Sequence, residues 1–238
     1  MKIKAIFFDL DGTLLPMDQE SFVNAYLGGL IKILAPRGYA PEEVGAALWK
    51  STGAMIRNDG KIYNEEVFWS AFSAILGDGI RDEEYLLDEY YAGDFQNVSR
   101  VCGYTERARE LIDLIKSTDL RIILATSPLF PTVATESRIR WAGLEPNDFE
   151  YVTTYENSRY CKPNPTYYTD LCEKMGLDPT EVAMIGNDVG DDMVAETIGM
   201  RVFLLTDCLI NRAGADISRY RQGGFDELFD FIKEIINE

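Results

Sequence analysis

Two aspartates separated by one residue, Asp9 and Asp11, end a short apolar stretch near the N-terminus. The stretch, residues 5–8, is typical of a strand buried on both faces, and alternate residues of a strand project from the same face. Two neighbouring carboxylates at a buried strand end repel each other and are costly to remove from water. A bound cation, or covalent modification of one aspartate, would relieve this repulsion. We therefore predict a site at this strand end, where open α/β sheets bind their ligands.

Two later segments add groups that suit a phosphate. Thr126 and Ser127 follow an apolar run, and a hydroxyl followed by backbone N–H groups can hold phosphate oxygens, although the same residues could simply cap the next helix. Lys162 stands between Cys161 and Pro163, and Pro165 follows shortly after. The two prolines fix an extended backbone around the lysine and open a helix beyond it.

A third segment is acidic. Asn187, Asp188, Asp191 and Asp192 follow the apolar run 182–185. Acidic residues at the start of a helix could merely complement its dipole, but three within five positions exceed what capping needs. Carboxylates with waters are the ligands that Mg2+ prefers.

Composition limits the possible partners. The chain has 238 residues, a net charge of −17 and a pI of about 4.4, and this negative charge disfavours nucleic acids and anionic membranes as partners. The chain contains no histidine, so Ser-His-Asp and Cys-His catalysis are excluded. The four cysteines form no CxxC pair, and neither a long apolar run nor a signal peptide is recognisable, so we expect a cytoplasmic protein with free thiols.

The predicted elements fall into two blocks. Residues 17–100 contain four stretches with helical spacing and nothing like a buried strand, which predicts a helical cap domain. Residues 1–16 and 101–238 alternate strands with helices, which predicts a core domain with a doubly wound parallel sheet in the α/β class. The helices are expected at 21–34, from 41, from 64, and at 82–91, 105–117, 132–142, 165–175, 191–198 and 225–236. The strands are expected at 5–8, 121–125, 151–153, 182–185 and 201–205.

The four polar segments resemble, in order and position, the motifs of the haloacid dehalogenase-like hydrolases, most of which are phosphatases. The resemblance implies a Rossmann-like core and an Asp9 nucleophile that forms an aspartyl-phosphate. It assigns Asp11 as general acid and base, and Lys162 as the cation that neutralises nucleophile and phosphate. Thr126, with Ser127 beside it, would position the phosphoryl group. Asp191 or Asp192 would orient the metal ligands.

The resemblance also implies Mg2+, bound by Asp9, by the Asp11 backbone carbonyl and by a ligand after the fourth predicted strand. The family usually has Gly-Asp there, whereas this chain has Asn187 at the aligned position and Asp188 next. The alignment favours Asn187. We prefer Asp188 because a carboxylate binds Mg2+ more strongly than an amide.

Within the family, the helical insertion resembles the cap of the phosphoglycolate phosphatase and β-phosphoglucomutase groups, and the dehalogenase branch lacks an acid at the position of Asp11. We therefore predict a phosphatase of small phosphorylated metabolites, either a monomer or a homodimer. A sugar phosphomutase, with Arg57 and Lys61 of the cap holding a sugar phosphate, is the first alternative. A non-catalytic phospho-aspartate sensor or binding protein is the second.

Overall fold

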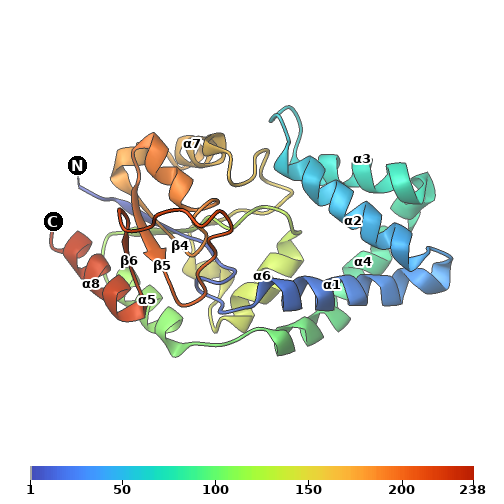
Figure 1. Cartoon of the computed structure of the whole chain (residues 1–238), viewed down its shortest axis with the longest axis horizontal. Helices are drawn as coiled ribbons and strands as arrows, with labels where there is room; N and C mark the ends of the chain where they lie inside the picture. The colour runs from blue at the N-terminus through green and yellow to red at the C-terminus, as the bar shows by residue number, and fades with distance from the viewer. Residues whose placement is uncertain (1) are drawn as a thin grey trace.

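The computed structural model describes residues 2–238 and has one parallel sheet of six strands, in the order β3-β2-β1-β4-β5-β6 (Figure 1). The strands are β1 (Ala5–Phe8), β2 (Arg121–Leu124), β3 (Tyr151–Val152), β4 (Val182–Gly186), β5 (Arg201–Leu205) and β6 (Arg221–Gly223). The strand order reverses next to β1, which pairs with β2 on one side and β4 on the other. The predicted α/β class and doubly wound parallel sheet are confirmed.

Side chains of β1 alternate between two hydrophobic cores. Ile6 and Phe8 pack in the core beneath helices α5, α6 and α8, whereas Ala5 and Phe7 pack on the opposite face, beneath α7 and the 3-10 helix η6. These elements are α5 (Glu106–Lys116), α6 (Thr132–Trp141), α7 (Pro165–Met175), η6 (Met193–Ile198) and α8 (Phe225–Ile236). Both faces of β1 are therefore dry, and the residues that follow it are held rigidly.

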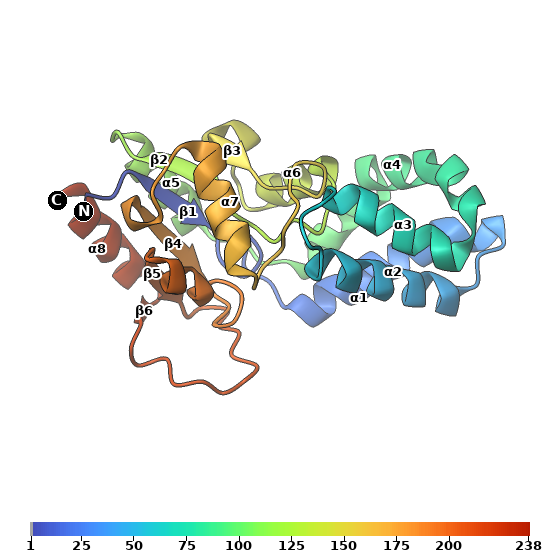
Figure 2. The ribbon, with the colours of Figure 1, turned by 90° about the horizontal axis from the view of Figure 1, so that it is seen from above.

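Four helices form a separate bundle beyond the carboxyl edge of the sheet, on the side away from both termini (Figure 2). They are α1 (Gln19–Leu34), α2 (Pro41–Ile56), α3 (Asn64–Leu76) and α4 (Glu84–Ala92). The chain enters and leaves this bundle through an antiparallel bridge between Met17 and Cys102, and the Gly103 N–H donates to the Pro16 carbonyl at 2.6 Å. The four helices lie within residues 17–100, for which a cap is expected.

Local sequence accounts for the ends of these helices. Asp18 accepts a hydrogen bond from the Ser21 N–H at 2.8 Å, so α1 starts at Gln19, two residues before the predicted Ser21. Pro41 occupies the first turn of α2, as predicted. Gly77, with a φ of +88°, ends α3.

The structure departs from the predicted elements in other places as well. The fourth cap helix begins at Glu84 rather than Asp82, after a 3-10 segment, η2 (Asp78–Glu83). The helix expected at 191–198 is the shorter η6, because the Asp188 carboxylate binds the N–H groups of Gly190 and Asp191 and holds a turn there. Strand β6 was not predicted, since a run of three residues carries no alternation of apolar side chains.

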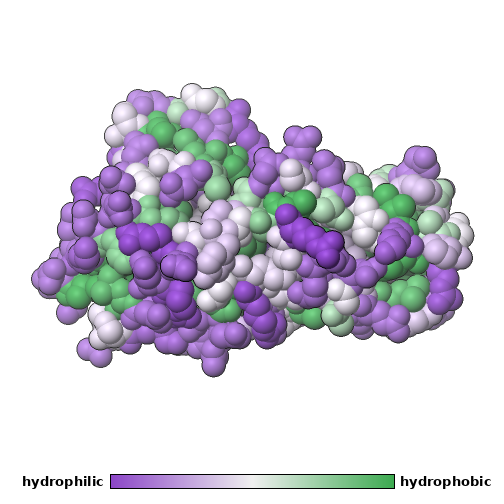
Figure 3. All heavy atoms as spheres, turned by 90° about the horizontal axis from the view of Figure 1, so that it is seen from below, coloured by the Kyte–Doolittle hydropathy of each residue, from purple (hydrophilic) through white to green (hydrophobic). Residues whose placement is uncertain are grey.

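The surface is mainly hydrophilic, with hydrophobic residues gathered only in small separate groups on the face that Figure 3 shows. Among residues 2–238, none of the helices combines the length and hydrophobicity that a membrane crossing requires.

Asn64 joins the cap to the core and is fully buried. Its backbone N–H donates to the Ser158 carbonyl at 2.9 Å, and its side-chain Nδ2 lies 3.3 Å from both the Pro128 carbonyl and Cys161 Sγ. Its Oδ1 accepts a hydrogen bond from Asn58 at 2.8 Å. One side chain therefore satisfies polar groups of both domains.

We predict that Asn64→Ala lowers the free energy of unfolding by about 1–3 kcal/mol, because buried partners on both sides lose their hydrogen bonds. Urea titration followed by circular dichroism measures this change. Asn97→Ala is the control, since that exposed side chain makes one hydrogen bond, within its own segment. Equal losses in the two variants would contradict the joining role of Asn64.

Candidate active site

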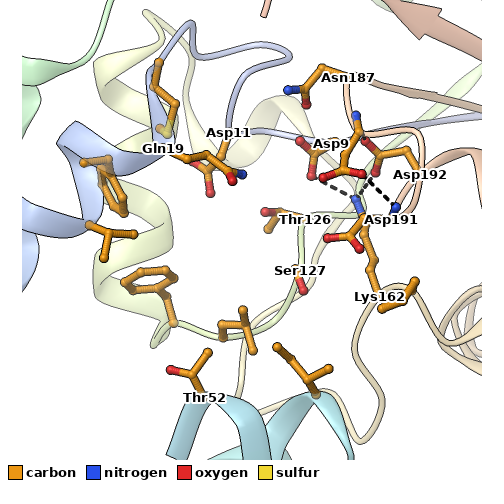
Figure 4. A pocket seen from close by; sticks show the side chains of 18 of the residues that line it. Asp9, Asp11, Gln19, Thr52, Thr126, Ser127, Lys162, Asn187, Asp191 and Asp192 are labelled. Carbon is orange, nitrogen blue, oxygen red and sulfur yellow. Dashed lines mark hydrogen bonds and ion pairs between the residues drawn. The ribbon is translucent and has the colours of Figure 1, made fainter. Parts of the chain in front are cut away.

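A cavity of about 380 Å³ lies between the carboxyl edge of the sheet and helices α1 and α2. Figure 4 shows most of the polar side chains at one end of this cavity and Thr52 of α2 at the other. All the side chains predicted from the sequence line it: Asp9, Asp11, Thr126, Ser127, Lys162, Asn187, Asp188, Asp191 and Asp192. The structure thus brings together residues from four segments of the chain.

Lys162 is buried between two carboxylates. Its ammonium lies 2.8 Å from Asp9 Oδ1 and 2.6 Å from Asp192 Oδ1. Burial alone would lower the pKa of Lys162, but the charges of Asp192 and Asp9 outweigh burial and raise this pKa well above its usual value. Lys162 therefore stays charged and can neutralise Asp9.

Asp192 also fixes the turn after β4. Its Oδ2 accepts a hydrogen bond from the Asp188 backbone N–H at 2.9 Å. Burial raises the pKa of Asp192, and the nearby Lys162 ammonium opposes that rise. This close approach requires a glycine at position 186, because a Cβ there would overlap the Asp192 carboxylate.

The amide of Asn187 is held with its oxygen toward Asp9. Asn187 Nδ2 donates to the Cys208 carbonyl at 2.7 Å, and Asn187 Oδ1 lies 3.0 Å from the Thr13 hydroxyl, which is also 3.3 Å from Asp9 Oδ2. A hydroxyl has one proton, so it can satisfy only one of these two oxygens at a time. The other oxygen keeps lone pairs that a cation could bind.

Both carboxylate oxygens of Asp188 already have partners within the protein. Its Oδ1 accepts the N–H groups of Gly190 and Asp191 at 2.8 and 3.1 Å, and its Oδ2 pairs with Arg212 at 2.5 Å. Arg212 belongs to the long loop after β5, which Figure 2 shows as an extended excursion beside the sheet. Burial and the charge of Asp188 together raise the pKa of Asp191.

The oxygen atoms around Asp9 and Asn187 suit the Mg2+ site that the sequence implies. Among residues 2–238, no three Asp, Glu, Cys or His side chains converge closely enough to enclose a metal by themselves. Mg2+ does not require such a cage, because it keeps several waters and uses one or two protein carboxylates. Asp9 Oδ2 and Asn187 Oδ1 fit this requirement, with the Asp11 carbonyl as a further oxygen.

Arg138 of α6 is a site residue that the sequence analysis missed. It is fully buried, and it forms an ion pair with Asp11 Oδ2 and stacks 4.3 Å from the centre of the Phe130 ring. Burial raises the pKa of Asp11, Arg138 opposes this rise, and the charge of Asp9 adds to it. Asp11 Oδ1 is buried without a hydrogen-bond partner among the described residues.

The hydroxyl of Thr126 faces the cavity without a hydrogen-bond partner among residues 2–238, while its carbonyl accepts hydrogen bonds from Thr153 at 2.6 Å and Tyr167 at 2.9 Å. Its backbone is therefore fixed and its hydroxyl is available to a ligand. Ser127 lies next to it on the cavity wall.

The model of the haloacid dehalogenase-like hydrolase family matches residues 3–199. The chain belongs to this family. It is 24% identical over 200 residues to a pyrophosphatase, PpaX, of Bacillus velezensis, covering 84% of this chain and 82% of that protein. Its fold is similar to that of a predicted phosphoglycolate phosphatase from Haemophilus somnus, with a TM-score of 0.60, 19% identity and coverage of 98% and 99%. It is also similar to a 2-haloacid dehalogenase from Pseudomonas syringae, with a TM-score of 0.62, 18% identity and coverage of 98% and 99%.

The residues that sequence reasoning missed contact the site from distant positions. Arg138 reaches Asp11 across 127 positions, and Thr13 reaches Asn187 across 174. Helix α6 is polar overall and also carries Glu136 and Arg140, so its sequence did not single out Arg138 as the buried arginine. Nothing in the local sequence distinguished Arg212 from an ordinary surface arginine.

We predict that Gly12→Ala weakens the apparent affinity for Mg2+ by about tenfold or more, because a Cβ there would overlap the Asn187 side chain and displace its amide. The φ of Gly12 is +89°, so the variant also loses about 1–2 kcal/mol of stability. Gly38→Ala is the matched control, since Gly38 has a φ of +94° with open space around it. Titrating the activity of both variants with Mg2+ separates the effect of backbone strain from the effect of displacing Asn187. An unchanged Mg2+ dependence in Gly12→Ala would refute the displacement of Asn187.

Proposed function

We propose that this hydrolase is a Mg2+-dependent phosphatase that cleaves small phosphomonoesters through an aspartyl-phosphate. The observation that carries the proposal is the placement of Asp9, with Oδ1 bound to the buried Lys162 ammonium and Oδ2 next to the Thr13 hydroxyl, which also contacts the amide oxygen of Asn187. A carboxylate neutralised in this way can approach a phosphate dianion, which it would otherwise repel. The hydroxyl of Thr126 lines the same cavity and has no partner among the described residues, so it is available to bind a phosphoryl oxygen in front of Asp9.

The reaction takes place in two displacements. Asp9 Oδ1 attacks phosphorus, the phosphorus–oxygen bond to the leaving group breaks, and Asp11 gives its proton to the departing alcohol. Arg138 holds Asp11 Oδ2, which leaves Oδ1 to carry that proton. Water then attacks phosphorus, Asp11 takes a proton from the water, and inorganic phosphate and the Asp9 carboxylate are released. Lys162 neutralises the charge that collects between Asp9 and the phosphoryl group in both steps.

Mg2+ would be held by Asp9 Oδ2, Asn187 Oδ1 and the Asp11 carbonyl, with Asp188 acting from further out. When bound, it supplies positive charge that stabilises the phosphoryl oxygens. This assignment follows the alignment and reverses the preference for Asp188 that rested on carboxylate chemistry, because both Asp188 oxygens already have partners. Asp192 orients the turn that carries Asn187 and Asp188.

The alternatives have weaker support. The mutase hypothesis invoked Arg57 and Lys61 as sugar-phosphate ligands, but neither lines the cavity, and Lys61 pairs with Asp59 at 2.6 Å. A sensor needs no substrate cavity of this size, and a dehalogenase needs no acid at Asp11. The pyrophosphatase name of the Bacillus velezensis relative makes pyrophosphate a substrate to include in the assays.

We predict that Asp9→Asn abolishes phosphate release from a generic ester such as 4-nitrophenyl phosphate, because the amide cannot act as the nucleophile. Excess EDTA should abolish turnover by the wild-type protein, and added Mg2+ should restore it. Asp170→Asn on helix α7 is the control, because Asp170 is not among the residues that line the cavity. Near-normal turnover by a folded Asp9→Asn variant would exclude Asp9 as the nucleophile, and full activity in EDTA would exclude the metal.

If Asn187 and not Asp188 binds Mg2+ directly, the two alanine variants should differ. Asn187→Ala should weaken the apparent Mg2+ affinity by about 10–100-fold, and Asp188→Ala should weaken it less. The reason is that the Asn187 amide oxygen faces Asp9, whereas Asp188 is engaged with its own turn and with Arg212. Metal titration of activity in the two variants measures the difference. A larger loss in Asp188→Ala would restore Asp188 as the ligand, as carboxylate chemistry favours.

A further inference from the structure

The cavity has two chemically different ends. The end at the sheet carries the carboxylates and Lys162, whereas the end formed by the cap and the segment after β2 is almost wholly apolar. We call this second end the apolar wall, and its principal residues are Phe22, Val23, Leu48, Trp49, Ile56 and Phe130. In the proposed reaction, a phosphoryl group in front of Asp9 directs its leaving group toward this wall.

The apolar wall presents an aromatic and an aliphatic side chain to the cavity. Trp49 and Ile56 of α2 are 57% and 40% exposed, whereas most large apolar side chains of the protein are buried. They lie two helical turns apart, so they share one face of α2 with Leu48 and Thr52. Large apolar groups exposed in a cavity favour an apolar ligand, because they lose contact with water when it binds.

Positive charge is scarce around this end. Among the described residues, the cations that line the cavity are Lys162 and Arg212. Lys162 is held by Asp9 and Asp192, and Arg212 is held by Asp188 and by Gln19, at 2.8 Å. A second anionic group on the substrate would therefore lose its hydration against the apolar wall without gaining an unengaged ionic partner.

We propose that the apolar wall binds the leaving group, and that the substrate is the phosphomonoester of an uncharged, mainly apolar alcohol, aryl or alkyl. Thr52 supplies a hydroxyl to such an alcohol, whereas the hydroxyl of Tyr26, which also lines the cavity, is engaged with that of Tyr91 at 2.7 Å. The inference rests on the proposed phosphatase function and narrows its substrate class. It disfavours substrates with a second anionic group, including pyrophosphate and phosphorylated carboxylic acids.

A matched series of alkyl esters tests the proposal with leaving groups of similar reactivity. We expect kcat/KM to rise by about fourfold for each methylene from ethyl to propyl to butyl phosphate. The butyl ester that ends in a carboxylate should be hydrolysed at least about a hundredfold less efficiently than butyl phosphate, because its charge is left unpaired. Pyrophosphate should also be a poor substrate.

Two variants link this preference to the wall. Trp49→Ala should lower kcat/KM for butyl phosphate by about tenfold and leave ethyl phosphate nearly unchanged. Tyr104→Ala is the control, because Tyr104 is 60% exposed and lies outside the cavity lining. Ile56→Arg should raise kcat/KM for the carboxylated ester and lower it for butyl phosphate.

The outcomes distinguish the two proposals. If none of the esters is hydrolysed in a manner that requires Asp9, the phosphatase proposal fails and this inference fails with it. If hydrolysis requires Asp9 but ethyl phosphate or the carboxylated ester is as good a substrate as butyl phosphate, only the apolar leaving-group site is overturned. Equal effects of Trp49→Ala on ethyl and butyl phosphate would also overturn it.

Discussion

Several carboxylates line one cavity at the carboxyl edge of the sheet, two of them in contact with the buried ammonium of Lys162, and their mutual repulsion constrains the rest of the site. These carboxylates belong to Asp9, Asp11, Asp188, Asp191 and Asp192. Each of three cations neutralises a different part of this charge: Lys162 lies between two carboxylates, Arg138 pairs with Asp11, and Arg212 pairs with Asp188. The oxygens that remain without a positive partner, beside Asn187 and Thr13, mark where a further cation would lower the energy of the site.

The fold holds these carboxylates in place because the backbone of the turns that carry them is fixed. Strands β1 and β4 are adjacent and buried, so the acidic turns that follow them are anchored to a packed core. Glycines at positions 12 and 186 let the two turns approach each other and Asp192 more closely than any other residue would allow. The cap closes the opposite side with apolar side chains, which gives the charged groups a partly dry cavity in which their interactions are strengthened.

Sequence reasoning was most successful where the pattern is local. Helices α7 and α8 and strand β5 have the predicted limits, since prolines, glycines and apolar periodicity define them within a few residues. The nine predicted site residues line one cavity because parallel strands deliver their carboxyl ends to one edge. What could not be predicted depends on contacts between distant residues. The orientation of Asn187 is set by Thr13 and the Cys208 carbonyl, and Arg138 meets Asp11 only in the folded chain.

In the proposed mechanism, a carboxylate of the protein, and not water, first attacks phosphorus. The most direct test is the stereochemistry of hydrolysis of an aryl phosphate made chiral at phosphorus with sulfur and oxygen isotopes, carried out in isotopically labelled water. Each in-line displacement inverts the configuration, so attack by Asp9 followed by attack of water gives net retention. We predict retention. Net inversion would mean a single displacement by water and would contradict the role assigned to Asp9.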